Sequence, residues 1–329
     1  MIMNNAMITG IASYIPDDVL DNEMLSQMVD TTDEWITRRV GIKERRILKN
    51  NAGSSYMGIR AVDKLLNETG TDRDEVDLII CATSNPDYRF PSTASIIAHA
   101  VGIEKKCYAY DIQGACAGFI VALYDAAAYV RSGIYKKVIV VAAEKMSSMT
   151  DYTDRSTCPL FGDASAAVLV EPGEGPEGII DGVFHINGEG LEHLVYRAGG
   201  SAHPSSHETI DAHLHYVYQE GSAVYRHAVM GQLTSSQEVM ERNHLTCDDI
   251  QWFVPHQANL RIIEAVGARM GIDNDKVLVN IQHRGNTSAA SIPLCLDENK
   301  HRLHKGDKVV LTAFGAGFTW GAIYLIWAI

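Results

Sequence analysis

Apolar residues in this chain gather into short continuous runs and do not alternate with polar residues. The clearest strand-like runs cover residues 78–82, 138–143 and 308–313. A strand that is apolar throughout is typical of a sheet buried on both faces, with helices on each side. Stretches with helical spacing separate the runs, and we expect helices at 93–101, 118–131, 260–270 and 288–296. The pattern therefore predicts an α/β fold.

The second half of the chain repeats the order of the first at an offset of about 170 residues. Residues 74–82 parallel 248–256, residues 110–113 parallel 279–282, and residues 137–142 parallel 308–313. Such a repeat predicts two related halves, each a mixed sheet covered by helices. We place the boundary in the Gly- and Pro-rich segment 171–176, which gives a first unit of residues 1–172 and a second of residues 173–329.

Three polar residues follow predicted strands in segments rich in small residues. Cys116 opens a predicted helix, His256 ends a strand, and Asn286 takes nearly the place in the second half that Cys116 has in the first. Backbone amides and the dipole at a helix N-terminus favour a thiolate, so we expect the pKa of the Cys116 thiol to lie below its usual value of ~8.5. A thiolate can attack an acyl thioester. We expect the three residues to meet at the seam between the halves.

Each of these residues also has a purely structural interpretation. A lone histidine is more often a structural hydrogen-bonding residue, and Gly-Asn-Thr is common in turns. His283, near Asn286, is interpreted as a loop residue. Most free cysteines are small buried hydrophobic residues, and this interpretation applies to Cys81, Cys107, Cys158, Cys247 and Cys295.

Composition narrows the classes of function. The net charge of −13 and the sequence pI near 5.4 argue against nonspecific binding to nucleic acid, which needs a cationic surface. The six cysteines form no CxxC pair, as expected for reduced thiols in a cytoplasmic protein. No run reaches the roughly 18 apolar residues of a membrane span, and the N-terminus lacks the pattern of a secretion signal.

The segments around Cys116, His256 and Asn286, together with residues 32–36 and 314–321, resemble the β-ketoacyl-[acyl-carrier-protein] synthase III family of the thiolase-like superfamily. The resemblance covers nearly the whole chain. It implies a thiolase-like fold of two related α/β halves in a five-layered αβαβα arrangement, usually as a homodimer. The asparagine implies the initiating type, because elongating relatives pair the cysteine with two histidines.

The resemblance also implies a reaction. An acyl-CoA primer, expected to be acetyl-CoA, would acylate Cys116 and then condense with malonyl-acyl carrier protein as CO2 leaves. His256 and Asn286 would stabilise the enolate, and the backbone amides of Cys116 and Ala316 would form the oxyanion hole. Relatives often have glycine at the position of Ala316, but the backbone amide remains. The implied chemistry uses no metal and no redox cofactor.

Binding residues follow from the same resemblance. Trp35 would stack on adenine, with Arg39 and Arg155 facing it. Thr31 would lie near them, and Ser222 stands where relatives usually have asparagine. The implied contacts of coenzyme A are Thr31, Trp35, Arg39, Arg155, Ala258 and Asn259.

Two further surfaces are implied in the same way. Phe90 would reach across the dimer and close the partner's acyl pocket, which favours a short primer. An acidic carrier protein would bind a local basic patch formed by Arg226, Arg261 and Arg269. Such a patch is needed because the chain as a whole is negatively charged. We expect Arg261 and Arg269, eight residues apart, to share one helix face.

Several alternatives remain at this stage. A relative with the same Cys-His-Asn set could load another acyl group in a specialised pathway. A non-decarboxylating thiolase needs a second cysteine near the C-terminal glycine loop, and none follows Cys295. A catalytically silent binding protein would not take up an acyl group. For the histidines of the segment 203–215 a surface loop is favoured over a metal site, since no ligand spacing matches a known one; they are His203, His207, His213 and His215.

Overall fold

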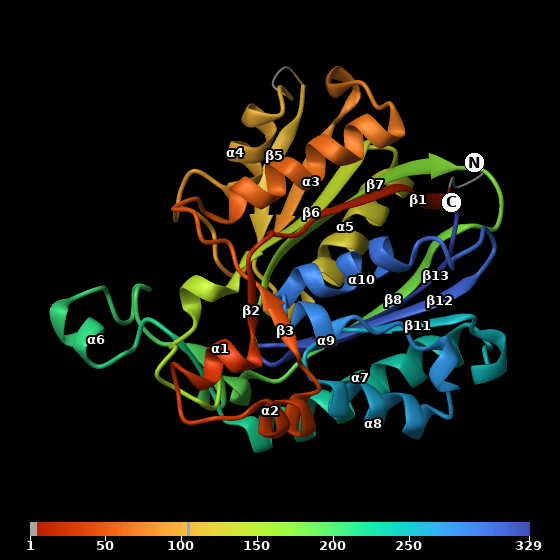
Figure 1. The fold of residues 1–329 in the computed structure, drawn as a ribbon. Helices are drawn as coiled ribbons and strands as arrows, with labels where there is room; N and C mark the ends of the chain where they lie inside the picture. Colours follow the sequence, from red (N-terminus) through yellow and green to blue (C-terminus); the bar gives the residue numbers. More distant parts are fainter. Residues whose placement is uncertain (1–4, 104–105) are drawn as a thin grey trace.

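Two large β-sheets lie one above the other in the computed structural model, which describes residues 5–103 and 106–329 (Figure 1). Within the described residues the first sheet has the strand order β1-β7-β6-β4-β5. Its strands are β1 (Asn5–Tyr14), β4 (Leu78–Ala82), β5 (Tyr108–Ile112), β6 (Val138–Lys145) and β7 (Asp163–Gly173). The second sheet has the order β11-β12-β13-β8. Its strands are β8 (Gly178–Ile186), β11 (Trp252–Pro255), β12 (Lys308–Gly315) and β13 (Thr319–Ile326).

The two sheets repeat the same pairing. In the first, β4 pairs parallel with β6, and β7 pairs antiparallel with both β6 and β1. In the second, β11 pairs parallel with β12, and β13 pairs antiparallel with both β12 and β8. The strands predicted at 78–82, 138–143 and 308–313 are therefore confirmed, each close to the predicted bounds.

The predicted counterpart of β5 in the second half is wrong. Residues 279–282 were expected to form a strand, but the chain makes only an isolated bridge between Phe253 and Val277 and then enters α9 (Ile281–Arg284). The amide of Asn280 donates to the Gln257 side chain and not to a neighbouring strand (3.0 Å). A side-chain partner of this kind removes the backbone group that would extend the ladder.

Helices complete a five-layered αβαβα arrangement, as predicted (Figure 1). Helices α3 (Ser54–Thr69) and α4 (Thr93–Ala100) cover the outer face of the first sheet, and α7 (Gly221–Arg242) and α8 (Leu260–Met270) cover that of the second. Helices α5 (Gly118–Ser132) and α10 (Ser291–Asn299) lie between the sheets. The continuous core of this middle layer joins both halves of the chain, from Phe119 to Trp327.

The chain passes from the first sheet to the second between Gly173 and Gly178. The boundary expected at residues 172 and 173 thus lies at the end of β7. Because the middle layer is shared, the division into two units stays a prediction. None of the helices that the structure describes is long and apolar enough to cross a membrane.

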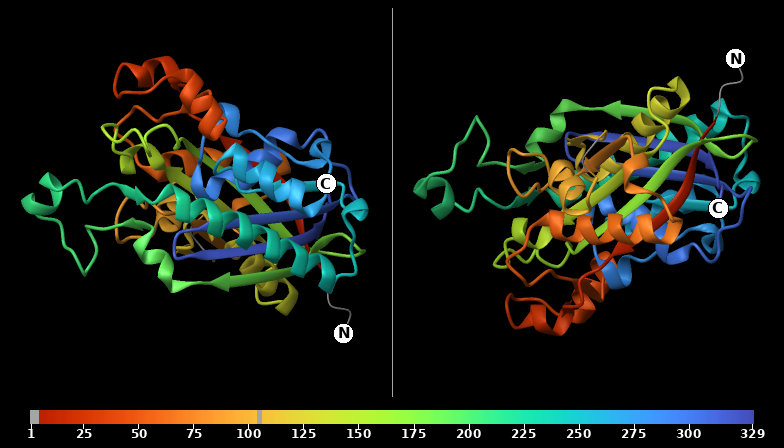
Figure 2. Two further views of the ribbon diagram at one scale, coloured as in Figure 1. Left: turned by 90° about the horizontal axis from the view of Figure 1, so that it is seen from below. Right: turned by 90° about the horizontal axis from the view of Figure 1, so that it is seen from above.

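Smaller elements surround the two sheets. The first-half segment with β2 (Val19–Asp21), α1 (Asn22–Ser26), α2 (Asp33–Val40) and β3 (Glu44–Arg46) packs against α8 and α9 of the second half. Strands β9 (Leu194–Tyr196) and β10 (Val217–Gln219) pair, and the chain between them carries α6 (His207–Asp211). This connection projects from the body of the protein in all views (Figures 1 and 2).

Arg45 is a fully buried cation that ties the first-half segment to the loop before β7. Its guanidinium donates to the carbonyl of Leu20 (3.1 Å), the side chain of Asn22 (2.8 Å) and the carbonyl of Pro159 (2.6 Å). Burial lowers its pKa to about 10, so it stays charged. The Arg45 Cβ also lies against Gly285, where an added Cβ would come within 3.1 Å of it, and where φ is +64°. A glycine is therefore needed next to Arg45.

We expect Arg45→Met to lower the free energy of unfolding by about 3 kcal/mol, because two buried acceptors and one part-buried acceptor lose their donor. Denaturant titration of the wild type and the variant measures this difference. Arg46→Met is the matched control, since Arg46 is only partly buried and donates to the carbonyls of Pro16 and Asp17. A change at residue 45 no larger than at residue 46 would contradict the anchoring role.

Candidate active site

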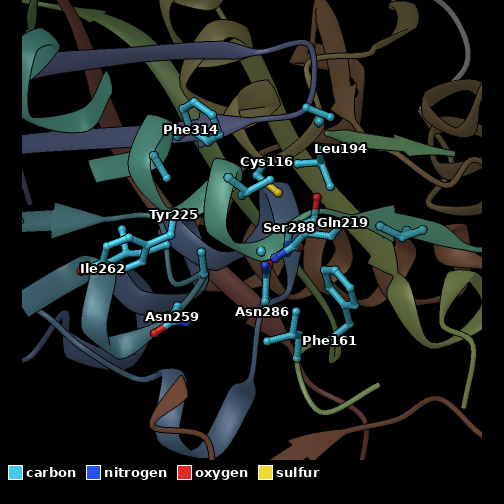
Figure 3. A pocket seen from close by; sticks show the side chains of 18 of the residues that line it. Cys116, Phe161, Leu194, Gln219, Tyr225, Asn259, Ile262, Asn286, Ser288 and Phe314 are labelled. Atoms are coloured by element: carbon cyan, nitrogen blue, oxygen red, sulfur yellow. The ribbon is translucent and has the colours of Figure 1, made fainter. Parts of the chain in front are cut away.

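A cavity of about 1220 Å³ lies at the seam between the halves, and all three predicted catalytic residues line it. Figure 3 shows Cys116 and Asn286 in this cavity. Cys116 enters it from the first half, and His256 and Asn286 enter from the second. The exposed side chains of Arg39 and Arg155 also line it. A cavity of this volume is within or slightly above the range typical of small-molecule and cofactor sites.

Cys116 sits in the single turn η2 (Ala115–Ala117), which connects β5 to α5. Ala115 adopts a φ of +46°, so the chain turns sharply before the nucleophile. Part of the Cys116 side chain borders the cavity, but burial of its sulfur among protein atoms raises its pKa to about 12. The expectation of a lowered pKa at the helix N-terminus is wrong, because desolvation disfavours the thiolate more than nearby hydrogen bonds stabilise it. The resting residue is a thiol.

The glycine-rich end of β12 lies against the backbone of Cys116. A Cβ added at Gly315 would come within 2.8 Å of the Cys116 amide nitrogen. Glycine at this position therefore lets β12 and the turn after it approach the nucleophile closely. Ala316 lines the same cavity, so both expected oxyanion-hole residues lie on one wall.

His256 follows β11 and is almost fully buried (1% exposed). Its Nδ1 lies 2.6 Å from the Ser291 hydroxyl oxygen, which also accepts the Gln257 amide at 3.3 Å. When the Ser291 hydroxyl donates to Nδ1, the hydroxyl hydrogen and the Gln257 amide hydrogen are both paired, and the imidazole proton is on Nε2. Burial lowers the pKa of His256 to about 3, so the ring is neutral. A neutral ring of this tautomer donates a hydrogen bond from Nε2.

Asn286 is held in place by both halves. Its amide donates to the carbonyl of Leu160 (2.8 Å), and its carbonyl accepts the amide of Gly162 (3.0 Å). Its side-chain Oδ1 accepts the amide of Ser288 (2.9 Å). Because Oδ1 is engaged, the Nδ2 hydrogens are the groups left for the cavity. Asn286 can thus act as a second hydrogen-bond donor there.

The indole of Trp35 lies beside two guanidinium groups at the exposed part of the cavity. The Arg155 Cζ is 4.6 Å from the ring centre, and the Arg39 Cζ is 6.0 Å away. Cationic and planar groups arranged in this way suit a nucleotide with phosphates. Ala258, Asn259 and Ser222 line the same cavity. Thr31 does not, since it is buried (7% exposed) outside the cavity wall, ahead of α2.

Comparisons with known proteins identify the family of this chain. Residues 110–188 match the family described as 3-oxoacyl-[acyl-carrier-protein] synthase III, and residues 240–327 match its C-terminal part. A β-ketoacyl-[acyl-carrier-protein] synthase III of Porphyromonas gingivalis is 55% identical over 98% of this chain and 97% of its own. The chain belongs to the 3-oxoacyl-[acyl-carrier-protein] synthase III family. It is therefore an acyltransferase of the condensing type.

Solved structures agree with the assignment to this synthase III family. The crystal structure of the synthase III from Aquifex aeolicus has a TM-score of 0.89 and 40% identity, with 98% of this chain and all of that chain covered. The priming β-ketosynthase of the R1128 polyketide pathway has a TM-score of 0.92 and 33% identity, with 99% of this chain and 97% of that chain covered. The fold is thus shared by a 3-oxoacyl-[acyl-carrier-protein] synthase III and by a priming enzyme of a polyketide pathway.

The three arginines expected to bind a carrier protein are all exposed. Arg226 on α7 and Arg261 on α8 also line the cavity, whereas Arg269 lies farther along α8, where its Nη1 is 3.5 Å from the Met230 sulfur. The expectation of a single helix face is wrong, because eight residues at 100° each leave the two α8 arginines about 80° apart around the helix axis. They occupy neighbouring faces of one helix.

Other predicted residues lie outside this chain's cavity. Phe90 is 85% exposed and does not line it. His283 lies on α9, not in a loop, with an exposed side chain near Glu44 (3.7 Å), so it takes no part in the site. His213 lies on the projecting connection and has an exposed side chain, as expected of a surface segment. Its Nδ1 is 2.7 Å from the carboxylate of Asp151. Among the described residues no group of three or more His, Cys, Asp or Glu side chains could hold a metal ion.

Three polar residues of the synthase site were not predicted. Ser288 and Ser291 follow Asn286 in the same segment, and their spacing along a turn and a helix start was a usable signal. Glu144 is the first charged residue after the apolar run of β6 and is fully buried. A buried carboxyl group with a raised pKa beside an active-site cavity is a candidate functional residue.

We expect Ser291→Ala to lower the rate of the condensation step by roughly 10- to 100-fold, because His256 loses the group that orients it and fixes its tautomer. Acylation of Cys116 should stay within about twofold of the wild-type rate. Single-turnover assays of the two steps measure this separation. Ser236→Ala is the matched control, since Ser236 is equally buried but its hydroxyl has no hydrogen-bond partner. Equal losses in both steps would contradict the orienting role.

Proposed function

We propose that this protein catalyses the initiating condensation of an acyl-CoA primer with malonyl-acyl carrier protein, and that acetyl-CoA is its preferred primer. The observation that supports this most strongly is the convergence of the Cys116 thiol, a neutral His256 and Asn286 on one buried cavity. A thiol holds an acyl group as a thioester, and two neutral donors stabilise an enolate oxygen. Both capacities are needed for a decarboxylating condensation, and the site has both.

In the first half-reaction Cys116 attacks the acyl-CoA thioester. The proposed oxyanion hole, the amides of Cys116 and Ala316, stabilises the tetrahedral intermediate. Coenzyme A then leaves as a thiol, and the acyl group stays on the sulfur. The nucleotide end of coenzyme A is proposed to lie on Trp35, between Arg39 and Arg155.

In the second half-reaction the malonyl thioester occupies the space that coenzyme A left. Nε2 of His256 and Nδ2 of Asn286 donate to its carbonyl oxygen as CO2 departs. Because the pKa of His256 is lowered to about 3, the histidine acts as a hydrogen-bond donor and not as an acid over the neutral pH range. The resulting carbanion attacks the carbonyl carbon of acyl-Cys116, and the bond from that carbon to the Cys116 sulfur breaks. The 3-oxoacyl-carrier protein is released, and the Cys116 thiolate takes up a proton to restore the thiol.

A cytoplasmic homodimer is part of the proposal. Strand β5 is at the edge of the first sheet, where exposed Tyr108 marks a surface suited to a second copy. The exposure of Phe90 is consistent with a side chain that closes the partner's acyl pocket. The acidic carrier protein is proposed to bind Arg226, Arg261 and Arg269. The first two of these arginines also line the cavity.

A second function is favoured by the likeness to the priming β-ketosynthase of the R1128 pathway. In that case the same site would accept a different primer and serve a polyketide pathway. The choice of acyl-CoA separates the two functions, because the condensation chemistry is common to both.

We expect intact-protein mass spectrometry to show one acetyl group added after incubation with acetyl-CoA, and none on Cys116→Ala. Branched- and medium-chain acyl-CoA, offered separately, should react more slowly. Uptake of only a longer or branched acyl group would favour the polyketide or another specialised pathway. Failure of every acyl-CoA to modify the wild type would contradict the proposed function and favour a silent binding protein.

A further inference from the structure

Glu144 is a buried carboxyl group that neither half-reaction above uses. It lies near the end of β6 with no exposed surface. The neighbouring cation does not neutralise it, because the Lys145 ammonium donates to the carbonyls of Ala52 (2.7 Å) and Asn50 (3.3 Å). A buried carboxyl group without a cation needs hydrogen-bond donors, and it favours the protonated form.

Donors from both halves of the chain converge on Glu144. The Ser84 amide donates to both carboxylate oxygens (3.1 and 3.0 Å), and the Ser84 hydroxyl donates to one of them (3.0 Å). From the second half, the Ala289 amide lies 3.4 Å away, and the nearby Ser288 hydroxyl also favours the ionised carboxylate. Glu144 is thus fixed at the seam, next to the segment that carries Asn286.

Ser288 connects this carboxyl group to the nucleophile. Its hydroxyl is close enough to the Cys116 thiol and to Glu144 to favour the ionised form of both, and it lies 3.2 Å from the Ser84 hydroxyl, which itself donates to Glu144. Ser288 adopts a φ of +50°, and its amide donates to Asn286 Oδ1. Its backbone is therefore held in place, and Figure 3 shows Ser288 beside Cys116 in the cavity. A single hydroxyl separates the sulfur from the carboxylate.

The thiol needs a proton acceptor. Burial raises the pKa of Cys116 to about 12, so almost no thiolate exists at neutral pH before substrate binds. His256 is a poor acceptor, since burial lowers its pKa to about 3. Burial raises the pKa of Glu144 to about 7, which is close to the working pH of a general base. Of these groups, Glu144 is the best matched to the proton of the thiol.

Other titratable groups face this network from the adjoining strands. Cys81 on β4 is fully buried, and its pKa is raised, first by burial and then by the charges of Asp111 and Glu144. Asp163 on β7, opposite Lys145, accepts from the Leu48 amide (2.8 Å) and from the Ser147 amide (2.8 Å) and hydroxyl (2.6 Å). Asp163 is thus directed to Leu48 and Ser147, and Cys81 interacts with Glu144 through its charge, whereas the Ser288 hydroxyl lies close to both Glu144 and Cys116.

We propose that Glu144 accepts, through the Ser288 hydroxyl, the proton that Cys116 releases when it attacks the acyl-CoA thioester. The inference deepens the proposed function and rests on it. Cys116 passes its proton to the Ser288 oxygen as Ser288 passes its own to Glu144, and the new Ser288 hydroxyl hydrogen then stabilises the thiolate. The sulfur forms a bond to the acyl carbon, and the bond from that carbon to the sulfur of coenzyme A breaks.

The step balances without any further reactant. The leaving thiolate of coenzyme A takes up a proton, which Glu144 returns through Ser288. One thiol and one thioester give one thioester and one thiol. Ionised Glu144 is the active form, so acylation should rise with pH up to about 7 and level off above it. Glu144 acts through Ser288 and does not touch the substrate.

A purely structural role for Glu144 makes a different prediction. The carboxyl group could simply hold the turn at Ser84 and the start of η7 (Ser288–Ala290), and its loss would then disturb both half-reactions alike. Glu144→Gln keeps the size and one acceptor oxygen but cannot take a proton. Glu144→Asp keeps an ionisable group. Ser288→Ala removes the connecting hydroxyl and leaves the carboxyl group in place.

The test is the rate of acetyl-Cys116 formation from acetyl-CoA between about pH 5.5 and 9, measured by rapid quench and mass spectrometry. We expect Glu144→Gln and Ser288→Ala to lower this rate by about 100-fold near pH 7.5 and to lose the inflection near neutral pH. Glu144→Asp should keep an inflection at a reduced rate. Transfer from preformed acetyl-Cys116 to malonyl-acyl carrier protein should stay within about threefold of the wild type in Glu144→Gln.

The outcomes separate this inference from the proposed function. If wild-type Cys116 is never acylated, the proposed function fails. If the wild type is acylated but Glu144→Gln keeps its rate and inflection, only the role of Glu144 is overturned. Equal losses in both half-reactions of Glu144→Gln, with the inflection unchanged, would likewise overturn it in favour of a structural role. If Ser288→Ala is acylated at the same rate as the wild type, the route through that hydroxyl is overturned.

Discussion

Desolvation of polar groups between two packed sheets is the constraint on which the rest of this site depends. It raises the pKa of Cys116 to about 12 and that of Glu144 to about 7, and it lowers that of His256 to about 3. Buried groups of this kind favour their neutral forms. The chemistry therefore relies on hydrogen bonds that are in place before substrate arrives, and on short routes for protons, more than on standing charges.

The segment from Gly285 to Ser291 supplies most of those hydrogen bonds. Asn286 offers its side-chain amide, Ser288 contacts Cys116, and Ser291 contacts His256. The segment belongs to the second half of the chain, but the first half holds it through Leu160 and Gly162, behind which lies Arg45. This dependence explains why a duplicated fold places its site at the seam. Neither half contains the nucleophile, the two donors and their supports together.

The sequence predicted most of the elements, and it pointed to three residues that the structure brings together in one cavity. Continuous apolar runs predicted β4, β6 and β12 because a strand covered on both faces leaves that pattern, and helical spacing predicted α5 and α8. It could not predict the loss of a strand at 279–282, where the Asn280 amide donates to the Gln257 side chain, because that contact joins residues 23 positions apart. It also gave the wrong sign for the pKa shift of Cys116. The local helix end is visible in a sequence, whereas the depth of burial comes from distant chain segments.

The most direct test of the account is a single-turnover transfer from isolated acetyl-enzyme. Acetyl-Cys116 is freed of coenzyme A and mixed with malonyl-acyl carrier protein, and CO2 and 3-oxoacyl-carrier protein are counted together. The account predicts one molecule of each for every acetyl group lost from the enzyme. CO2 release without loss of the acetyl group, or hydrolysis of acetyl-Cys116 without a 3-oxoacyl product, would contradict it.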